Sequence, residues 1–321
     1  MSFKHTVTPF GDFEKHSFEN AQGDGFDLVP QYGACLLDLR FGGVSFLDGY
    51  KTPEELVENA WSKNIFLVPF PNRLRDGKYT HEGKNYQFDI NNADSQNAIH
   101  GFCKDMPMTV DRVIVSDEQA DIRCIWQHDG AHPAYPFRFY FEVNFIMTKQ
   151  ATWKNKVLFE VATVLANKDE VAIPAGLGWH PYFALSEKVD DTFLQMPHSQ
   201  MIVVDDRLLP TGEKQPYTAF DTLKPIGETN LDNGFFITEK GSEAHVILKS
   251  KRGKLQYWQT LRNQELNFLQ VFTPPHRRSI AIEPMTCNID AFNNKDGLVV
   301  LEPDKGLYLQ CGVRFTRTTN R

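Results

Sequence analysis

Two histidines and one glutamate lie in local sequences that suit proton transfer to a bound molecule. His180 falls within residues 176–183, where two glycines precede it and Pro181 follows it. Glycine permits backbone conformations that other residues avoid, and proline fixes φ, so this imidazole is predicted to be held in position. His100 and Glu283 lie in two further stretches of similar character. An imidazole and a carboxylate can donate one proton while removing another, which is general acid/base catalysis.

Each of these residues also has a purely structural interpretation. His180 could be a core histidine whose ring is satisfied by a backbone carbonyl. Glu283 follows an apolar run, so we expect it at the end of a buried strand, where partial burial would raise its pKa and suit it to act as a base. The alternative is an ordinary surface glutamate. The aromatic residues around His180 favour function, since Trp179, Tyr182 and Phe183 offer flat surfaces for the C–H faces of a sugar ring.

The overall composition argues against several classes of protein. With a net charge of -7 over 321 residues, the chain is not predicted to bind nucleic acid, which normally requires a basic surface. No apolar run approaches the ~18 residues that span a bilayer, and the first residues do not form an export signal. We therefore expect no membrane association and a cytoplasmic location. The five cysteines are scattered without a C-x-x-C pair and are expected to be reduced thiols.

The sequence lacks the commonest motifs for cofactors and nucleophiles. It has no G-x-S-x-G elbow, phosphate-binding P-loop, dinucleotide fingerprint or H-E-x-x-H pair. Arg73 and Arg75 flank Leu74, so on a strand they share one face, either as a hydrogen-bonding fork or as a solvated edge. Of the two, Arg73 is the one expected to function. What remains is acid/base chemistry that needs neither a cofactor nor a metal.

Short runs rich in β-branched and aromatic residues, separated by turn signals, occupy most of the chain from residue 25 onward. Four successive runs, at residues 108–115, 120–127, 137–148 and 156–166, predict neighbouring antiparallel strands. Later runs lie at residues 201–204, 234–238, 244–249, 254–260, 266–272, 279–282, 298–301 and 306–315. Because no strand-helix-strand rhythm and no linker interrupts them, we expect an all-β fold, with one large antiparallel β-sandwich domain spanning residues 1–321.

One helix and one small meander are predicted within this pattern. Thr52 is expected to cap a helix that has Pro53 at its first position, with Glu55 returning a hydrogen bond to the cap. Asp76-Gly77 and Glu82-Gly83 are turn signals, because both central residues of a tight hairpin turn need positive φ. They predict a β-meander between residues 72 and 88.

Taken in order along the chain, these stretches resemble the aldose 1-epimerase (galactose mutarotase-like) family. Each motif is short, and it is their shared order over most of the chain that carries the resemblance. The motifs are Asn72-Arg73, residues 77–79 and 83–86, Ile99-His100-Gly101, His180-Pro181-Tyr182-Phe183, residues 231–235, 270–273 and 282–286, Asp290-Ala291-Phe292, and residues 312–315.

The resemblance implies the large antiparallel β-sandwich of that family and a free hexose as the partner, whose α and β anomers interconvert by ring opening and reclosure. Glu283 would be the general base and His180 the general acid, without cofactor or metal. The groups that position the substrate would be Arg73, His100, Asp232, Asn72 and Gln270. A monomer or homodimer is expected.

Two other functions stay open at this stage. Within the family, a phosphorylated or otherwise anionic sugar could be the substrate, in which case Arg75 or Lys78 would join Arg73 at the site. In another class, a non-catalytic carbohydrate-binding β-sandwich would keep the aromatic residues. Such a module would not need Glu283 and His180 together.

Two further expectations concern the immediate surroundings of the site. The carboxylate of Glu283 is expected to favour the protonated form of His180, since a nearby anion stabilises a cation. The chain also departs from the commonest family pattern at Asn288-Ile289, where many relatives have prolines, and at Phe102, which replaces a glycine. These departures lie beside the expected site and bear on sugar preference.

Overall fold

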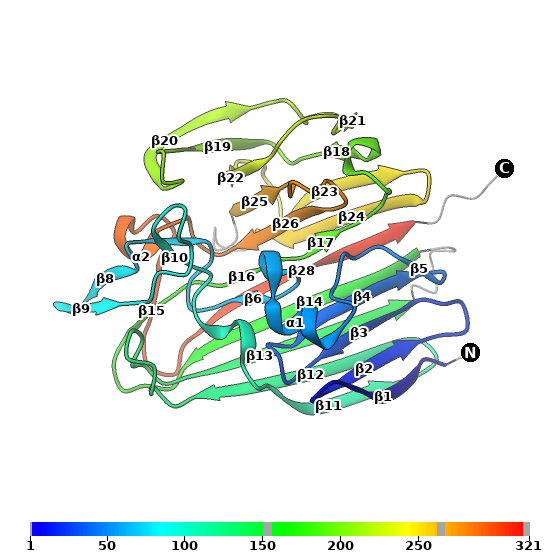
Figure 1. Ribbon diagram of the computed structural model, residues 1–321, viewed down its shortest axis with the longest axis horizontal. Helices are drawn as coiled ribbons and strands as arrows, with labels where there is room; N and C mark the ends of the chain where they lie inside the picture. The colour runs from blue at the N-terminus through cyan, green and yellow to red at the C-terminus, as the bar shows by residue number, and fades with distance from the viewer. Residues whose placement is uncertain (1, 150–155, 262–266, 317–321) are drawn as a thin grey trace.

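The computed structural model describes residues 2–149, 156–261 and 267–316, which form antiparallel sheets with few helical turns (Figure 1). Three sheets dominate. A five-stranded sheet has the order β1-β2-β3-β4-β5, and a nine-stranded sheet has the order β11-β12-β13-β14-β28-β24-β23-β18-β21. An eight-stranded sheet has the order β20-β19-β22-β25-β26-β16-β6, with β17 also paired to β26. The fold is therefore the all-β sandwich that the sequence predicted.

The elements have the following bounds. The five-stranded sheet contains β1 (Lys4–Phe10), β2 (Phe13–Glu19), β3 (Gly25–Val29), β4 (Cys35–Phe41) and β5 (Val44–Ser45). The nine-stranded sheet contains β11 (Thr109–Val115), β12 (Gln119–His128), β13 (Phe139–Lys149), β14 (Lys156–Asn167), β18 (Phe193–Gln195), β21 (Lys224–Pro225), β23 (Glu243–Ser250), β24 (Gly253–Thr260) and β28 (Gly306–Thr316). The eight-stranded sheet contains β6 (Phe66–Leu67), β16 (Gly178–Trp179), β17 (Tyr182–Phe183), β19 (Ser199–Val204), β20 (Pro210–Tyr217), β22 (Asp232–Ile237), β25 (Phe268–Phe272) and β26 (Ile280–Met285). Two-stranded sheets pair β7 (Arg73–Arg75) with β10 (Asn97–Ile99), β8 (Lys78–His81) with β9 (Lys84–Gln87), and β15 (Ile173–Ala175) with β27 (Val299–Leu301). The helical turns are α1 (Pro53–Glu58), α2 (Ala291–Asn294), η1 (Ala60–Ser62), η2 (Cys103–Asp105) and η3 (Val189–Asp191).

Most predicted strands are confirmed, whereas the β1–β2 hairpin and several other strands, β20 among them, were not predicted. The strands β11 to β14 coincide with four successive predicted runs and are neighbours in the nine-stranded sheet. The predicted run at residues 266–272 becomes β25, although residue 266 lies outside the described residues. The hairpin of β1 and β2 escaped prediction because β1 is almost entirely solvent-exposed and polar, so its sequence has no apolar alternation.

The core lies where the nine-stranded sheet meets the other two large sheets. Phe26 of β3 contacts Phe159 of β14 with 5.3 Å between ring centroids. Phe66 of β6 contacts Phe141 of β13 at 5.9 Å. Every second residue of β13 is buried from Phe139 to Met147, as the period of a strand requires. The abundance of phenylalanine in the sequence is thus explained by the contact between sheets.

The predicted helix and meander are each corrected in one detail. Thr52 caps α1 by accepting a hydrogen bond from the Glu55 N–H at 3.3 Å, but the Glu55 carboxylate accepts from the N–H of Lys51 rather than from the cap. Glu82 and Gly83 both have positive φ and close the β8–β9 hairpin. The third strand of the predicted meander is absent from it, because β7 pairs with β10 instead of β8.

The pairing along β26 sets the position of Glu283. This residue was predicted at a strand end, but β26 continues through it to Met285. On one side β25 pairs with the strand, with Gln270 opposite Glu283. On the other side β16 and β17 pair with the two ends of β26 and leave a gap at His180-Pro181 between them. The interrupted ladder therefore brings His180 beside the middle of β26.

The cysteines and the lengths of the helices bear on two further expectations. All five cysteines are buried free thiols, as predicted. Within residues 2–149, 156–261 and 267–316, no helix is long and apolar enough to cross a membrane.

A close backbone approach beside His100 gives the first testable prediction. Gly101 has φ +66°, and a Cβ there would lie 1.9 Å from the carbonyl oxygen of Val68. Gly83 has φ +72°, but no described heavy atom lies within 4 Å of its Cβ position. We expect Gly101→Ala to lower the free energy of unfolding by roughly 3 kcal/mol or more, and Gly83→Ala by about 1–2 kcal/mol. Urea denaturation measures the free energy of unfolding of both variants. Equal losses would show that the Val68 carbonyl does not crowd a side chain at position 101.

Candidate active site

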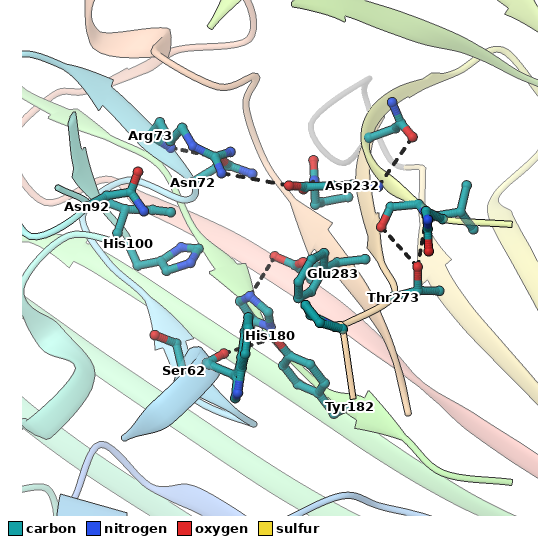
Figure 2. Close-up of a pocket in the computed structure, with 18 of the residues that line it drawn as sticks. Ser62, Asn72, Arg73, Asn92, His100, His180, Tyr182, Asp232, Thr273 and Glu283 are labelled. Atoms are coloured by element: carbon teal, nitrogen blue, oxygen red, sulfur yellow. Dashed lines mark hydrogen bonds and ion pairs between the residues drawn. The ribbon is translucent and has the colours of Figure 1, made fainter. Parts of the chain in front are cut away.

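A polar cavity of about 980 Å³ opens between the ends of several strands and loops (Figure 2). Its walls contain all seven residues that the sequence singled out, which are Asn72, Arg73, His100, His180, Asp232, Gln270 and Glu283. Figure 2 shows the labelled side chains among them converging on one space. Residues more than two hundred positions apart in the sequence, such as Asn72 and Glu283, are thus brought together.

His180 is fixed by its backbone and by a stacked ring. Its N–H donates to the carbonyl of Ile65 at 3.0 Å, and its carbonyl accepts from the N–H of Asn64 at 2.9 Å. The ring of Tyr182 stacks on the imidazole with 4.9 Å between centroids and an interplanar angle of 5°. The Tyr182 hydroxyl donates to the carbonyl of Trp61 at 3.0 Å, which holds this ring in turn. The prediction of a firmly positioned imidazole is confirmed.

The imidazole of His180 faces the carboxyl group of Glu283. Nε2 lies 3.4 Å from Oε2, and both side chains are almost completely buried. Burial raises the pKa of Glu283 well above its ordinary value; Asp232 adds to this rise and Arg73 opposes it. Burial lowers the pKa of His180 to about 3. The expectation that the neighbouring carboxylate would favour protonated His180 is therefore wrong, because loss of hydration outweighs the attraction.

His100, Asn72 and Arg73 form a second wall. Both Asn72 and His100 have positive φ, of 57° and 68°, and the His100 N–H donates to the Asn72 carbonyl at 2.8 Å. The Asn72 side-chain oxygen accepts from the Arg73 guanidinium at 3.1 Å. The His100 ring lies edge-on to His180, with centroids 5.1 Å apart. Burial lowers the pKa of His100, and electrostatic interactions with His180 and Arg73 lower it further, since a proton on His100 would add a second positive charge to this wall.

Asp232 and Gln270 close the cavity opposite Arg73. The Gln270 amide donates to Asp232 Oδ1 at 2.8 Å, while Asp232 Oδ2 lies 3.9 Å from the Arg73 guanidinium. Gln270 and Glu283 are opposite each other on paired strands, so the sheet register itself places them together. Within the described chain, Gln270 Oε1 and Glu283 Oε2 have no hydrogen-bond partner. Such buried polar atoms favour a ligand that supplies one.

The aromatic part of the prediction needs correction. Trp179 and Phe183 belong to the core and do not line the cavity, since strand neighbours point to opposite faces. Only Tyr182 of that group reaches the site. Trp61 and Phe272 line it instead. Trp61 lies in none of the motifs, whereas Phe272 stands two residues after Gln270 in the motif at residues 270–273, and alternate residues of a strand share a face.

The two departures from the family pattern lie outside the cavity lining. Phe102 stacks on His132 with 4.3 Å between centroids, and the buried Asn288 side chain donates to Asp296 at 2.9 Å. Neither residue is part of the lining among the described residues. They therefore support neighbouring loops without touching a bound sugar directly.

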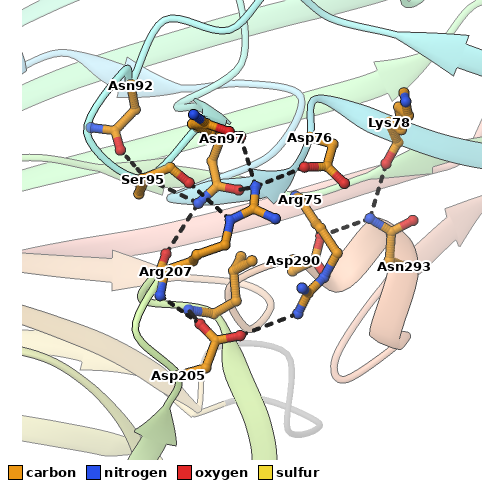
Figure 3. A network of polar contacts seen from close by, with 12 residues as sticks. Arg75, Asp76, Lys78, Asn92, Ser95, Asn97, Asp205, Arg207, Asp290 and Asn293 are labelled. Atoms are coloured by element: carbon orange, nitrogen blue, oxygen red, sulfur yellow. Dashed lines mark hydrogen bonds and ion pairs between the residues drawn. The ribbon is translucent and has the colours of Figure 1, made fainter.

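A network of polar contacts around Arg207 lies beside the cavity and was not predicted from the sequence (Figure 3). The Arg207 guanidinium donates to the carbonyl of Ser95 at 3.0 Å, to the carbonyl of Gln96 at 2.8 Å and to Asn97 Oδ1 at 3.0 Å, and it pairs with Asp76 at 2.7 Å. These contacts fix the start of the segment that continues into His100. A lone arginine in a loop carries no sequence signal for such a role.

Part of the same network holds the segment that carries Arg73. Arg75 pairs with Asp205 at 3.6 Å and with Asp290 at 3.7 Å. Asp290 also accepts from the Arg75 backbone N–H at 2.9 Å and donates its own N–H to the Arg73 carbonyl at 2.8 Å.

No group of three or more His, Cys, Asp or Glu side chains is arranged to hold a metal in the part of the chain that the structure describes.

Fold and site together define a large antiparallel β-sandwich with an imidazole–carboxyl pair at the base of a polar cavity. The sequence pattern of the aldose 1-epimerase family matches residues 22–312. The chain therefore belongs to the aldose 1-epimerase family, and its membership supports mutarotase-like epimerase chemistry on a sugar.

Known proteins are similar to this chain in sequence or in fold. The Escherichia coli K12 protein YihR, described as uncharacterized, is 28% identical over 291 residues, which cover 89% of this chain and 88% of YihR. A galactose mutarotase-like protein from Clostridium acetobutylicum has a similar structure, with a TM-score of 0.85, 19% identity and 98% of both chains covered. A galactose 1-epimerase from Lactobacillus acidophilus NCFM gives a TM-score of 0.80 at 16% identity, with 99% of both chains covered. The two structures show the shared fold.

The Arg207 network gives a second testable prediction. We expect Arg207→Met to lower the free energy of unfolding by about 1–2 kcal/mol, since it leaves three partly buried acceptors without a charged donor. Hydrogen exchange of the backbone amides at residues 97–100 should accelerate, and Arg207→Lys should restore part of the protection. Arg112→Met is the control, because Arg112 pairs with Asp121 at 3.1 Å within the β11–β12 hairpin. If exchange at residues 97–100 stays at the wild-type rate in Arg207→Met, the network does not position this segment.

Proposed function

We propose that this protein is a cofactor-independent aldose 1-epimerase that interconverts the α and β anomers of a free, neutral hexose. The observation that carries the proposal is the contact of 3.4 Å between His180 Nε2 and Glu283 Oε2 at the base of the cavity. Anomerisation needs one group that removes the proton of the C1 hydroxyl and one that protonates the ring oxygen. A neighbouring carboxyl and imidazole supply both.

The reaction follows from these two groups. The Glu283 carboxylate takes the proton of the C1 hydroxyl while the C1–O5 bond breaks, and O5 takes a proton from His180. The C1–C2 bond then rotates in the open aldehyde, and the reverse transfers close the ring to the other anomer. Each assisted proton transfer contributes about 10²–10⁴ in rate. Arg73, His100 and Asp232 would hold the sugar hydroxyls during rotation, with Asn72 and Gln270 orienting Arg73 and Asp232 respectively.

The pair must carry a single proton. Burial favours the proton on Glu283 and a neutral His180, because each charged form has lost its hydration. The reactive arrangement has the proton on His180, so a transfer across the contact between the two groups precedes ring opening. The positive charge of Arg73 favours this arrangement, since it lowers the pKa of Glu283. A bound sugar adds hydroxyl donors for the carboxylate, which act in the same direction.

The charges of the cavity support a neutral substrate. Asp232 Oδ2 lies 3.9 Å from the Arg73 guanidinium and offsets part of its charge. Arg277, also in the lining, is occupied by Asp190 at 2.6 Å, by Asn230 at 2.8 Å and by two backbone carbonyls. A phosphate here would be repelled by the Asp232 carboxylate and would compete with the contacts that hold Arg277.

The two rival functions lose their structural support. Arg75 and Lys78 were the extra cations expected for an anionic sugar, but Arg75 pairs with Asp205 and Asp290, and Lys78 lines a separate surface hollow. A binding module would gain nothing from burying two titratable groups in contact, since their desolvation destabilises the fold.

The cytoplasmic location and the single-domain organisation remain predictions; the five buried thiols support a reducing compartment.

The catalytic assignment gives a third prediction. We expect Glu283→Gln and His180→Asn each to lower the enzymatic interconversion of α-D-glucose or α-D-galactose by at least ~10²-fold, since each removes one proton-transfer group. Exchange between anomers measured by NMR gives the rate, and circular dichroism checks the fold. Tyr308→Ala, on an exposed side chain of β28, is the control. Wild-type rates in both variants would rule out the acid/base pair.

A fourth prediction concerns stability and pH. The pKa of Glu283 is higher in the folded chain than its ordinary value of 4.5, so its contribution to stability is full below pH 4.5 and is lost as the pH rises toward the folded pKa. The Glu283→Gln variant has no titratable carboxyl at this position, so it does not lose stability in this way. The melting temperature of the variant minus that of the wild type should therefore be at least about 2 °C larger at pH 8 than at pH 5. Differential scanning fluorimetry tests this, and a difference that is equal at both pH values would show that Glu283 is ionised when buried.

A further inference from the structure

A second hollow in the surface, the α1 hollow, is large enough to hold a small molecule. Its volume is about 520 Å³, within the ~300–1,000 Å³ that ligand pockets usually have. Its walls come from residues 47–51, the helix α1 and the segments around Ser186 and His276. Among the described residues, only Trp61 also lines the catalytic cavity. The α1 hollow is therefore a separate space, and the acid/base mechanism does not use it.

His276 supplies an unused hydrogen-bond donor at the wall of the α1 hollow. Burial lowers the pKa of His276, so the ring is neutral near pH 7. Nδ1 accepts from the Arg278 backbone N–H at 3.1 Å, which leaves the ring hydrogen on Nε2. Nε2 is buried and has no hydrogen-bond partner within the described chain, since Asp48 Oδ2 is 3.9 Å away and accepts from the Ser279 hydroxyl at 2.8 Å instead. A buried N–H of this kind favours a ligand that brings an acceptor.

Two cations lie close to this donor. Arg278 and Lys63 line the α1 hollow, and their charges lower the pKa of His276 further. The Lys63 ammonium pairs with Asp48 at 2.9 Å and lies 5.5 Å from the centre of the Tyr50 ring. Arg278 is exposed and has no ion-pair partner in the part of the chain that the structure describes. The imidazole N–H and the guanidinium together suit one carboxylate.

The α1 hollow also has acidic groups on other segments of its wall. Glu55 and Glu58 of α1 and Glu187 of the loop after β17 are exposed and line it. With His276 neutral, the charged residues of the lining are the cations Lys51, Lys63 and Arg278 and the anions Asp48, Glu55, Glu58 and Glu187. A simple anion would be repelled by the glutamates, and a simple cation by the basic residues. A ligand that carries one charge of each sign can satisfy both sets.

Trp61 adds an aromatic face beside these carboxylates. Its side chain is 46% exposed, and its ring lies edge-on to His276 with 6.2 Å between centroids. The backbone of Trp61 is left-handed, with φ 66° and ψ 6°, a conformation that persists in tryptophan only when surrounding contacts enforce it. One such contact is the hydrogen bond from the Tyr182 hydroxyl to the Trp61 carbonyl at 3.0 Å. The face of an indole ring attracts an ammonium group.

We propose that the α1 hollow is a binding site for a small zwitterion of the amino-acid class, with its carboxylate at His276 and Arg278 and its ammonium group at Glu58 and Trp61. The carboxylate accepts hydrogen bonds from Nε2–H and from the guanidinium, and such charge-assisted bonds are stronger than neutral ones. The ligand is neutral overall, so the mixed charges of the wall do not repel it. The inference does not depend on the proposed function, because binding is measured without catalysis.

The test is a titration followed by saturation-transfer NMR. The probes are glycine, 3-aminopropanoate, 4-aminobutanoate and 5-aminopentanoate, which differ in the separation of their two charges. At least one should bind the wild type with a Kd of about 1 mM or lower. Butanoate and butylamine, which each carry one charge, should bind at least ~10-fold more weakly than that probe. Absence of binding by all four zwitterions, or equal binding of a singly charged compound, would overturn the proposal.

Substitutions locate the bound probe. His276→Phe keeps a ring beside Trp61 but removes the Nε2–H donor, and it should raise the Kd at least ~10-fold. Glu58→Gln should raise the Kd about threefold, which is the effect of one exposed charge. If His276→Phe fails to fold, as judged by circular dichroism, Arg278→Met takes its place, since the exposed Arg278 can be replaced without disturbing the core. It should raise the Kd about fivefold.

Two matched variants serve as controls. Glu54→Gln removes an exposed charge from the same helix as Glu58, and His198→Phe replaces an exposed histidine; neither residue lines the α1 hollow. Both should keep the Kd of the wild type. If the probe binds with unchanged affinity to His276→Phe and to Glu58→Gln, it occupies another place on the protein, and the α1 hollow is not its site.

Discussion

The site depends on an interruption in the hydrogen-bond ladder along β26. Because β16 and β17 pair only with the two ends of this strand, His180-Pro181 can turn toward its middle, where Glu283 lies. Proline within the strand, at position 284, fits such a place, since a proline cannot complete a continuous ladder. The backbone of a rigid sheet, rather than a loop, thus sets the distance between the two titratable groups. Rigid placement of this kind is what proton transfer requires.

Placing two titratable groups in a sheet interior has an energetic consequence. Both lose hydration, and their pKa values move in opposite directions, so that burial favours the neutral form of each group. The surrounding core offsets this loss through the extensive packing of phenylalanines between the sheets. Arg73 is the nearest compensating charge, and it in turn is oriented by Asn72 and approached by Asp232. The acid/base pair and the substrate-positioning groups therefore form one electrostatic unit.

Much of the fold and the membership of the site could be predicted, for identifiable reasons. β11 to β14 alternate apolar and polar residues, which local sequence reveals, whereas the exposed β1 carries no such alternation. The site residues stand in short motifs, and their types disclose their chemistry. The orientation of side chains was harder to predict from the sequence. Whether Trp179 or Trp61 faces the cavity depends on strand register and on a strained turn, and both arise from contacts between residues distant in sequence. Burial, which reverses the expected protonation of His180, is likewise a property of the assembled sheets.

The position of the last strand has a consequence for how the chain folds during synthesis. β28 lies between β14 and β24 in the nine-stranded sheet, so the final described residues join its two halves. Until β28 has left the ribosome, the edges of β14 and β24 stay unpaired, and β14 must wait for a partner well over a hundred residues further along the chain. Contacts of such sequence separation slow folding, and exposed strand edges invite association with other chains. Translation must therefore have passed β28 before the two halves can join, and protection of the nascent β14 edge by a chaperone should matter more for this protein than its final stability suggests.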